Sequence, residues 1–353
     1  MSGPVPPGGT IGILGGGQLA RMLSLAAARL GLKTHIFCDK PEAPGFEVAA
    51  AHTLAPYTDT EALARFAASC DAVTYEFENV PAETAAFVAA HVPLRPNERA
   101  LALTQDRLVE KNFIASLGLA TPRFLDVSTV EDAGQVQGPS VLKTRRFGYD
   151  GKGQAMVATP EEAVAAFAKL GGVPCIAESF VDFAYEASII AARGVDGSFA
   201  AYDPPHNVHR HHILHRSTVP SPLTAEAVEN ALHIARSIGE GLDYIGVFAV
   251  ELFVGKDGAL IVNEIAPRVH NSGHWTMDAC LVSQFEQHIR AVAGWALGNP
   301  ERHSNAVMQN LIGEEAADWQ ALSQNGGALH LYGKRNFRPG RKMGHVNWIT
   351  PKG

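Results

Sequence analysis

The chain has 353 residues, of which 46% are hydrophobic and 18% charged, so it can bury a sizeable core and does not have the composition of a disordered protein. Its formal net charge of −7 and pI near 6.1 argue against a dedicated nucleic-acid-binding protein. Because this length exceeds what one ordinary core needs, we expect two or three packed subdomains.

The cysteines and the first residues bear on the cellular compartment. The four cysteines are widely scattered and include no C-x-x-C pair, which favours reduced thiols: Cys38, Cys70, Cys175 and Cys280. The first ten residues lack the basic and apolar regions of a signal peptide, and no apolar run reaches the roughly 20 residues that span a bilayer. We therefore expect a soluble, cytoplasmic protein that binds neither nucleic acid nor membrane.

The first hundred residues alternate between strand and helix patterns. A buried strand is predicted at 10–14, a tight turn at Gly15–Gly17 and an amphipathic helix over 18–32. Further elements are expected at 34–38 (strand), 59–69 (helix), 71–77 (strand) and 81–91 (helix). Strands separated by helices predict a Rossmann-like α/β domain, with a parallel sheet covered on both faces.

The first turn carries the pattern Gly15-x-Gly17-x-x-Ala20, which loosely fits a dinucleotide fingerprint, with Asp39 near the position of a ribose-binding acid. Its glycines would let main-chain N–H groups approach an anion at the start of the helix. That geometry suits any phosphate, so it indicates a phosphate more strongly than a nicotinamide. The alternative is a tight turn without a ligand.

A boundary is expected near 95–105, and the region beyond it is predicted to be α+β. Turn signals at 194–197 and 255–258, each between alternating apolar runs, predict antiparallel hairpins. The other expected elements are helices over 105–119, 160–170 and 279–296, a strand at 140–144, and strands between 174 and 202. We expect domains at 1–100, 101–300 and 301–353.

The segments 247–254 and 259–268 are apolar strands, each interrupted by one glutamate, Glu251 or Glu264. Pairing through the intervening turn should bring the two carboxylates together on one face. Unpaired carboxylates on a half-buried face are costly unless a cation compensates. With Asn263 as a neutral oxygen donor, this set favours Mg²⁺. A structural ion pair is the alternative, although neither strand contains a basic residue near its glutamate.

A glycine-rich segment, TRRFGYDGKGQ (144–154), follows a strand that ends near Lys143. It lacks the G-x-x-x-x-G-K-[ST] pattern and is not a P-loop. Its glycines predict a mobile flap whose amides, with Lys152, close over phosphates, while Tyr149 and Asp150 reach a second substrate. By itself it could be an ordinary loop, but its place between Lys143 and the acidic pair favours a nucleotide lid.

These features resemble the ATP-grasp superfamily, in which two α+β subdomains clamp ATP between antiparallel sheets. Further motifs resemble the 5-(carboxyamino)imidazole ribonucleotide synthases in family order, from residue 11 to about 348. The motifs are GILGGGQLARML, TYEFENVP, GYDGKGQ, ESFV, ELF, NEIAPR, APRVHNSGHWT and YGKRNFRPGRKMGH. The resemblance implies a preATP-grasp domain, an ATP-grasp domain and a small C-terminal domain within the boundaries given above.

The resemblance implies ATP and Mg²⁺ as cofactors, with the metal held by Glu251 and Glu264. Phosphates would be met by Arg107 and Lys143, adenine by 178–181 and ribose by Glu186. The full set of implied ATP contacts is Arg107, Lys143, Gly148, Tyr149, Asp150, Gly151, Lys152, Gly153, Gln154, Glu178, Ser179, Phe180, Val181, Glu186, His209, Asn263 and Glu264.

It also implies 5-aminoimidazole ribonucleotide and bicarbonate as substrates, carboxyphosphate as the intermediate, and a homodimer. Ribonucleotide contacts would come from Gly16, Gln18, Leu19, Glu78, Asn271, Ser272, Lys334 and Arg341. Catalytic roles would fall to Tyr149, Asp150, Arg268 and His270. Within that set, Arg268 would neutralise the transferring phosphoryl group, and Asp150 or His270 would accept the amine proton.

Two positions depart from the family pattern. Val269 stands where proline is common, which should loosen a turn without removing a ligand. His212 stands where glycine is common, within a histidine run that we interpret as an exposed loop in preference to a transition-metal site: His206, His209, His211, His212 and His215. The alternative functions are an ATP-grasp enzyme with another acceptor (a ribonucleotide formyltransferase or a biotin-type carboxylase), a nicotinamide-dependent dehydrogenase, and a silent nucleotide-binding regulator.

Overall fold

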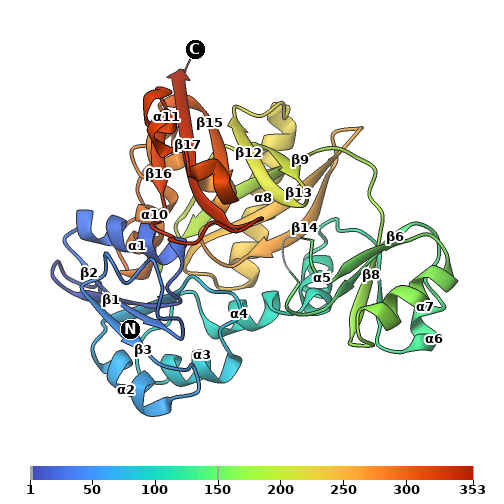
Figure 1. Ribbon diagram of the computed structural model, residues 1–353, viewed down its shortest axis with the longest axis horizontal. Helices are drawn as coiled ribbons and strands as arrows, with labels where there is room; N and C mark the ends of the chain where they lie inside the picture. Colours follow the sequence, from blue (N-terminus) through green and yellow to red (C-terminus); the bar gives the residue numbers. More distant parts are fainter. Residues whose placement is uncertain (1–2, 149–150, 353) are drawn as a thin grey trace.

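The computed structural model describes residues 3–148 and 151–352. The structure contains three β-sheets (Figure 1): a parallel sheet in the N-terminal part, a large central sheet, and a small sheet that projects to one side. Within those residues, no helix is both long and apolar enough to cross a membrane.

The N-terminal sheet is parallel, as the strand and helix alternation predicts, in the order β3-β2-β1-β4. Its strands are β1 (Thr10–Leu14), β2 (Lys33–Cys38), β3 (Ala51–Leu54) and β4 (Ala72–Tyr75). Its helices are α1 (Gln18–Arg29), α2 (Thr60–Ala68) and α3 (Ala82–Ala89). Strand β1 lies in the middle and is almost wholly buried, which explains its uninterrupted apolar run.

The large sheet is antiparallel and follows the order β14-β13-β9-β11-β12-β15-β17-β16, with β10 paired to β9. Its strands are β9 (Phe183–Arg193), β10 (Phe199–Ala201), β11 (His206–Arg210), β12 (Ile213–Val219), β13 (Gly246–Gly255), β14 (Leu260–Ala266), β15 (Ser304–Ile312), β16 (Ala328–Leu331) and β17 (Lys342–Pro351). Both predicted hairpins are confirmed, as β9–β10 and β13–β14. The last three strands extend the central sheet, so residues beyond 300 do not form a sheet of their own.

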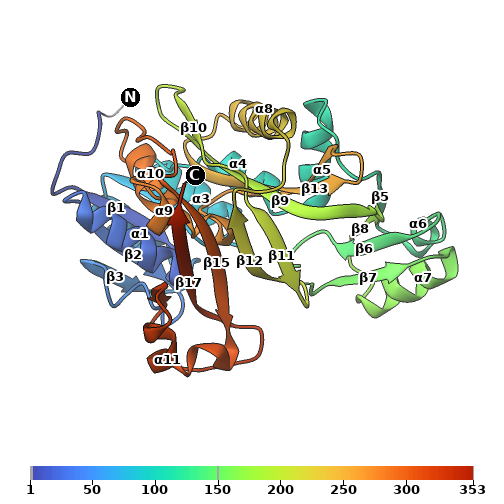
Figure 2. The same ribbon diagram turned by 90° about the horizontal axis from the view of Figure 1, so that it is seen from above.

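The small sheet has the order β5-β8-β6-β7 and its own hydrophobic core, which includes Val127, Leu142 and Phe167. Its strands are β5 (Phe124–Val127), β6 (Ser140–Thr144), β7 (Gln154–Val157) and β8 (Cys175–Ser179), and its helices are α6 (Val130–Ala133) and α7 (Pro160–Lys169). Figure 2 shows this unit standing apart from the rest. The small sheet therefore packs around a core separate from that of the central sheet.

The largest hydrophobic core lies between the N-terminal domain and the central sheet. It contains Ile11 of β1, Leu23 of α1, Ala249 of β13, Phe285 of α10 and Met308 of β15. The remaining helices are α4 (Glu98–Thr104), α5 (Arg107–Ser116), α8 (Ala225–Gly241), α9 (Thr276–Ala279), α10 (Gln284–Val292) and α11 (Trp319–Gln324), with short 3₁₀ turns at Asn271–Gly273 and Gly313–Ala316.

The helix predicted over 279–296 is confirmed as α10 but is shorter at both ends, because the chain is extended between α9 and α10. Ser283 is extended there, and its side chain caps α10 by accepting a hydrogen bond from the Glu286 N–H. The helix predicted over 105–119 is shorter, since Asp106 caps α5 through the N–H groups of Leu108 and Val109.

Candidate active site

The acidic pair lies in register on adjacent strands. Glu251 of β13 is directly opposite Glu264 of β14, which confirms the predicted pairing. The next pair is Leu252 with Val262, so Asn263 is an extra residue that forms a β-bulge. In a regular strand neighbouring side chains point to opposite faces, but the bulge sets both Asn263 and Glu264 opposite Glu251. The side-chain Oδ1 of Asn263 is buried without a hydrogen-bond partner among the described residues.

Each glutamate has a basic partner from another element. Arg107 Nη1 lies 2.9 Å from Glu264 Oε2, and His270 Nε2 lies 3.1 Å from Glu251 Oε1. Burial alone would raise the pKa of Glu251, but the hydrogen bond and charge of His270 outweigh it and lower the pKa. The absence of basic residues from the two strands therefore did not mean the absence of ion pairs.

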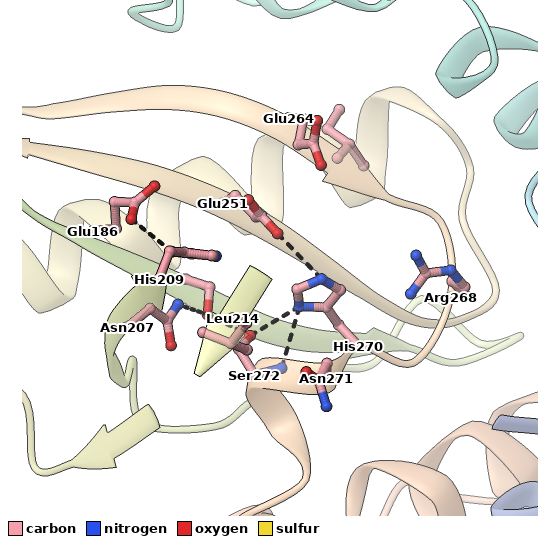
Figure 3. Close-up of polar contacts among 12 residues, drawn as sticks. Glu186, Asn207, His209, Leu214, Glu251, Glu264, Arg268, His270, Asn271 and Ser272 are labelled. Atoms are coloured by element: carbon pink, nitrogen blue, oxygen red, sulfur yellow. Dashed lines mark hydrogen bonds and ion pairs between the residues drawn. The ribbon is translucent and has the colours of Figure 1, made fainter. Parts of the chain in front are cut away.

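His270 belongs to a buried polar chain (Figure 3). Its Nδ1 accepts a hydrogen bond from the Ser272 N–H at 3.4 Å and contacts Ser272 Oγ at 2.9 Å. The chain continues from Ser272 Oγ to Ser188 Oγ at 2.6 Å, and Asn207 Nδ2 donates to Ser188 Oγ at 2.9 Å. Because Nδ1 accepts from the main chain, Nε2 is the ring nitrogen that donates to Glu251.

Glu186 and His209, both predicted to lie near the ribose, contact each other beside the acidic pair (Figure 3). His209 Nδ1 is 2.6 Å from Glu186 Oε2. Burial opposes the charged ring, but this hydrogen bond outweighs burial and raises the pKa of His209. The carboxylate thus favours a protonated imidazole.

The histidine run is not one exposed loop, and that interpretation is wrong for three of its members. His206 and His209 lie on β11 and His215 on β12, each partly or fully buried. Only His211 and His212 are exposed, and they form the hairpin turn with positive φ angles of 50° and 64°. A turn of this kind favours glycine, which gives the physical reason for glycine at position 212 in the family pattern. In the described part of the chain, no group of three or more His, Cys, Asp or Glu side chains is arranged to hold a metal ion.

The small sheet contributes a second charged cluster. Lys143 Nζ of β6 donates to Glu178 Oε2 of β8 at 2.9 Å, and Lys111 Nζ of α5 lies 3.6 Å from the same oxygen. Burial would raise the pKa of Glu178, but the two ammonium groups outweigh it and lower the pKa. Oε1 of this glutamate is buried without a partner among the described residues.

The glycine-rich flap joins β6 to β7. The predicted residues Tyr149 and Asp150 lie outside the described part of the chain. At its base, Gln154 pairs with Lys143, and the Thr144 N–H donates to the Gly153 carbonyl at 2.8 Å. Arg107 Nη2 donates to the carbonyl of Gly148 at 3.4 Å, so this arginine links the flap to the acidic pair. Gly151 and Gly153 have positive φ angles, and Lys152 is exposed. Of the predicted adenine contacts, Ser179 ends β8, and Phe180 and Val181 follow it, with Phe180 exposed.

The carboxyl group of Glu76 already occupies the start of α1. Its Oε1 accepts a hydrogen bond from the Gly17 N–H at 2.5 Å, which argues against a phosphate at this amide. A Cβ on Gly15 would lie 2.8 Å from Glu76 Oε1, and one on Gly17 2.9 Å from it. These glycines therefore admit a carboxylate from the end of β4, a role that no local pattern indicated.

Replacing Gly15 by alanine tests that close approach. Gly15→Ala is expected to destabilise the fold by about 2 kcal/mol, because it adds a clash to the strain of a φ near +104°. Gly118→Ala is the matched control, since its φ of +73° is also positive but a Cβ there meets nothing within 4 Å. The free energies of unfolding in urea should differ; equal losses would contradict the role of the contact.

Lys334 and Arg341, two of the predicted ribonucleotide contacts, lie together at a cavity of about 200 Å³. It is lined by Lys334, Arg341, Arg335, Gly333 and part of the 41–47 segment. Lys334 Nζ donates to the Lys342 carbonyl at 2.6 Å. Burial, together with the nearby charge of Arg341, lowers the pKa of Lys334 to about 8. The three basic side chains that line the cavity outnumber its two carboxyl groups, Glu42 and Glu47, which favours an anionic ligand.

The other predicted ribonucleotide contacts fall into three groups. Arg268 Nη2 lies 2.8 Å from Glu78 Oε1, so the turn after β14 meets the N-terminal domain at the site. Leu19, Asn271 and Ser272 are buried, with Leu19 in the core, Asn271 paired with Asn310, and Ser272 in the chain described above. Their side chains are engaged within the protein. Gly16 and Gln18 flank the Gly17 amide.

Sequence reasoning missed three charged residues of this region: Glu76, Glu110 and Lys111. All are partly or fully buried, and their partners are more than 50 residues away along the chain. Glu110 and Lys111 are adjacent charged residues followed by Asn112, a local pattern that also occurs on exposed helix faces, so no periodic signal marked them as buried.

Known proteins match the whole chain in the same order of parts. Family models match at 9–105 (ribonucleotide synthetase preATP-grasp domain), 112–285 (ATP-grasp domain) and 306–352 (phosphoribosylaminoimidazole carboxylase C-terminal domain). The chain is 48% identical over 353 residues to N5-carboxyaminoimidazole ribonucleotide synthase of Brucella melitensis, and the match covers 98% of each protein. The chain belongs to the N5-carboxyaminoimidazole ribonucleotide synthase family.

Solved structures of the synthase family agree with this. An ADP complex of an N5-carboxyaminoimidazole ribonucleotide synthetase matches with a TM-score of 0.94 and 39% identity, over 99% of this chain and 94% of the other. An Aspergillus clavatus N5-carboxyaminoimidazole synthase in complex with ADP and 5-aminoimidazole ribonucleotide matches with a TM-score of 0.90 and 28% identity, over 98% and 94%. The predicted family and the predicted fold class are confirmed.

Proposed function

We propose that the chain uses ATP and bicarbonate to carboxylate 5-aminoimidazole ribonucleotide in de novo purine biosynthesis, giving 5-(carboxyamino)imidazole ribonucleotide, ADP and phosphate. A bicarbonate oxygen attacks the γ-phosphorus, which forms carboxyphosphate and releases ADP. The exocyclic amine then takes up the carboxyl group, directly or through released carbon dioxide, and phosphate leaves. We also expect a cytoplasmic homodimer, as the family resemblance implies.

The observation that carries this proposal is the register of Glu251 with Glu264 across the bulge, which gathers oxygen donors where Arg107 meets the flap. ATP would lie between the small sheet and the central sheet. Its phosphates would replace the carboxylates that now accept from Lys143 and Arg107. Each cation is held in place by an anion that a phosphate can mimic.

The donor set fits Mg²⁺. Two carboxylates and a buried Asn263 Oδ1 with no partner among the described residues are the hard oxygen donors that this ion prefers. Glu251 and Glu264 would hold it with Asn263 beside them. When bound, the ion would neutralise negative charge on the ATP phosphates.

The ribonucleotide would place its phosphate dianion between Lys334 and Arg341 and its amine toward Arg268. Arg268, held by Glu78, would neutralise charge on the phosphoryl group during transfer. His270 would take up the amine proton only after Nδ1 leaves Ser272, because both ring nitrogens are engaged. Flap closure would keep water from carboxyphosphate.

A coupled assay of ADP release tests the function. We expect turnover only when ATP, Mg²⁺, bicarbonate and 5-aminoimidazole ribonucleotide are all present at saturating amounts, with at least a tenfold drop when any one is omitted. A requirement for formate in place of bicarbonate would identify a formyltransferase. NADH binding without ATP turnover would indicate a dehydrogenase, and ATP binding without ADP under every mixture a silent regulator.

A further inference from the structure

Strand β14, which carries Asn263 and Glu264, is an edge strand of the central sheet. Its outward main-chain groups have no neighbouring strand, and unpaired N–H and C=O groups are costly when buried. Helix α5 covers this edge. The Ile265 N–H donates to Glu110 Oε1 at 2.7 Å, and Lys111 Nζ donates to the Asn263 carbonyl.

These two contacts come from consecutive residues of α5 and lie on either side of Glu264. They act on the segment where the bulge departs from regular strand pairing. A bulge is locally weaker than a regular ladder, because the extra residue is unpaired. The hydrogen bonds of Glu110 and Lys111 with the main chain just before and just after Glu264 therefore fix the direction in which the side chains of the bulge project.

The burial of both side chains indicates that they do more than fill space. Glu110 is 2% exposed and Lys111 is 0% exposed, whereas such residues are almost never fully buried unless paired. A helix can cover a strand with apolar side chains at lower cost. Lys111 also lies 3.6 Å from Glu178 Oε2, so it ties the edge strand to β8 of the small sheet.

We propose that Glu110 and Lys111 are positioning residues that hold the bulge at Asn263, and thereby the orientation of Asn263 and Glu264 toward metal-bound ATP. The inference rests on the proposed function, since it assigns these two residues to the same nucleotide site. Neither residue contacts a substrate; both act through the main chain of β14. A purely structural role would instead affect stability and both substrates alike.

The test separates the contact from the acidic group at position 110. Glu110→Asp keeps a carboxyl group but withdraws it by one methylene from the Ile265 N–H, whereas Glu110→Gln removes the acidic group but keeps an acceptor there. We expect Glu110→Asp to raise the KM for MgATP at least tenfold while the KM for 5-aminoimidazole ribonucleotide stays within twofold. The KM of Glu110→Gln for MgATP should be at least fivefold lower than the KM of Glu110→Asp.

Lys111→Met should show the same split between the two KM values, with Lys169→Met on an exposed turn of α7 as its control. Binding of Mn²⁺ and ADP, followed by electron paramagnetic resonance, gives a readout that does not need turnover. In Glu110→Asp it should weaken by the same factor as the KM. The inference is overturned if Glu110→Asp leaves the MgATP KM within twofold, or if both KM values rise together. The proposed function would instead be overturned if the wild-type protein binds Mn²⁺ and ADP but never forms ADP from ATP.

Discussion

Glu264→Gln is expected to reduce ADP release at least 100-fold at saturating Mg²⁺, while the melting temperature stays close to that of the wild type. The substitution removes one of the two negative charges proposed to hold the metal, and preorganised charges at a transferring group are typically worth about 10²–10³ in rate. The amide keeps the shape of the side chain and can still accept from Arg107, which lies 2.9 Å from Oε2. Activity and stability should therefore separate.

The control for this variant is Glu240→Gln, which makes the same chemical change at an exposed position near the end of α8. It should leave both turnover and melting temperature unchanged. Turnover of Glu264→Gln within threefold of the wild type would remove Glu264 from the metal site, and the pairing with Glu251 would then be structural. Measuring ADP release over a range of Mg²⁺ concentrations checks that excess metal does not rescue the variant.

Arg268→Gln is expected to lower turnover about 1,000-fold, because arginines that neutralise a transferring phosphoryl group contribute roughly 10³–10⁵ to such reactions. The guanidinium of Arg268 lies 2.8 Å from Glu78, and Arg268 is two residues beyond the end of β14, the strand that carries Glu264. Glutamine can still hydrogen-bond to Glu78, so the contact with the N-terminal domain is preserved while the charge is lost.

Two further variants serve as controls for Arg268→Gln. Arg65→Gln removes an exposed arginine paired with Glu61 at 3.8 Å and should have no effect on turnover. Glu78→Gln keeps an acceptor for Arg268 and should cost much less than Arg268→Gln. Single-turnover ADP formation measures the phosphoryl-transfer step directly; a rate for Arg268→Gln within fivefold of the wild type would contradict the proposed role.

Several features of the fold and site could be predicted because their signals are local. The apolar run before Gly15 and the helix pattern after it predicted the parallel sheet, since strand and helix periods differ. The turn between β13 and β14 set the register that placed Glu251 opposite Glu264. The family motifs then predicted that the site binds ATP and the ribonucleotide.

The sheet boundaries beyond residue 300 and the break between α9 and α10 could not be predicted from those signals. Strands β15 to β17 lie within the residues expected to form a small C-terminal domain. They pair onto β12 and complete the central sheet. Strand pairing over such distances depends on which edges remain available after the rest of the chain has packed. A pattern of apolar residues shows that a strand has a buried face and does not show its neighbour.

The acidic pair shows the same division at the scale of single residues. The sequence by itself determined that two carboxylates face each other on paired strands, because a turn and an alternating pattern lie within twenty residues. Only the tertiary structure decided that a bulge turns Asn263 toward them and that Arg107, His270, Glu110 and Lys111 surround them. Those contacts depend on how α5 and the turn after β14 pack against the strands, and packing between distant segments leaves no periodic trace in the sequence.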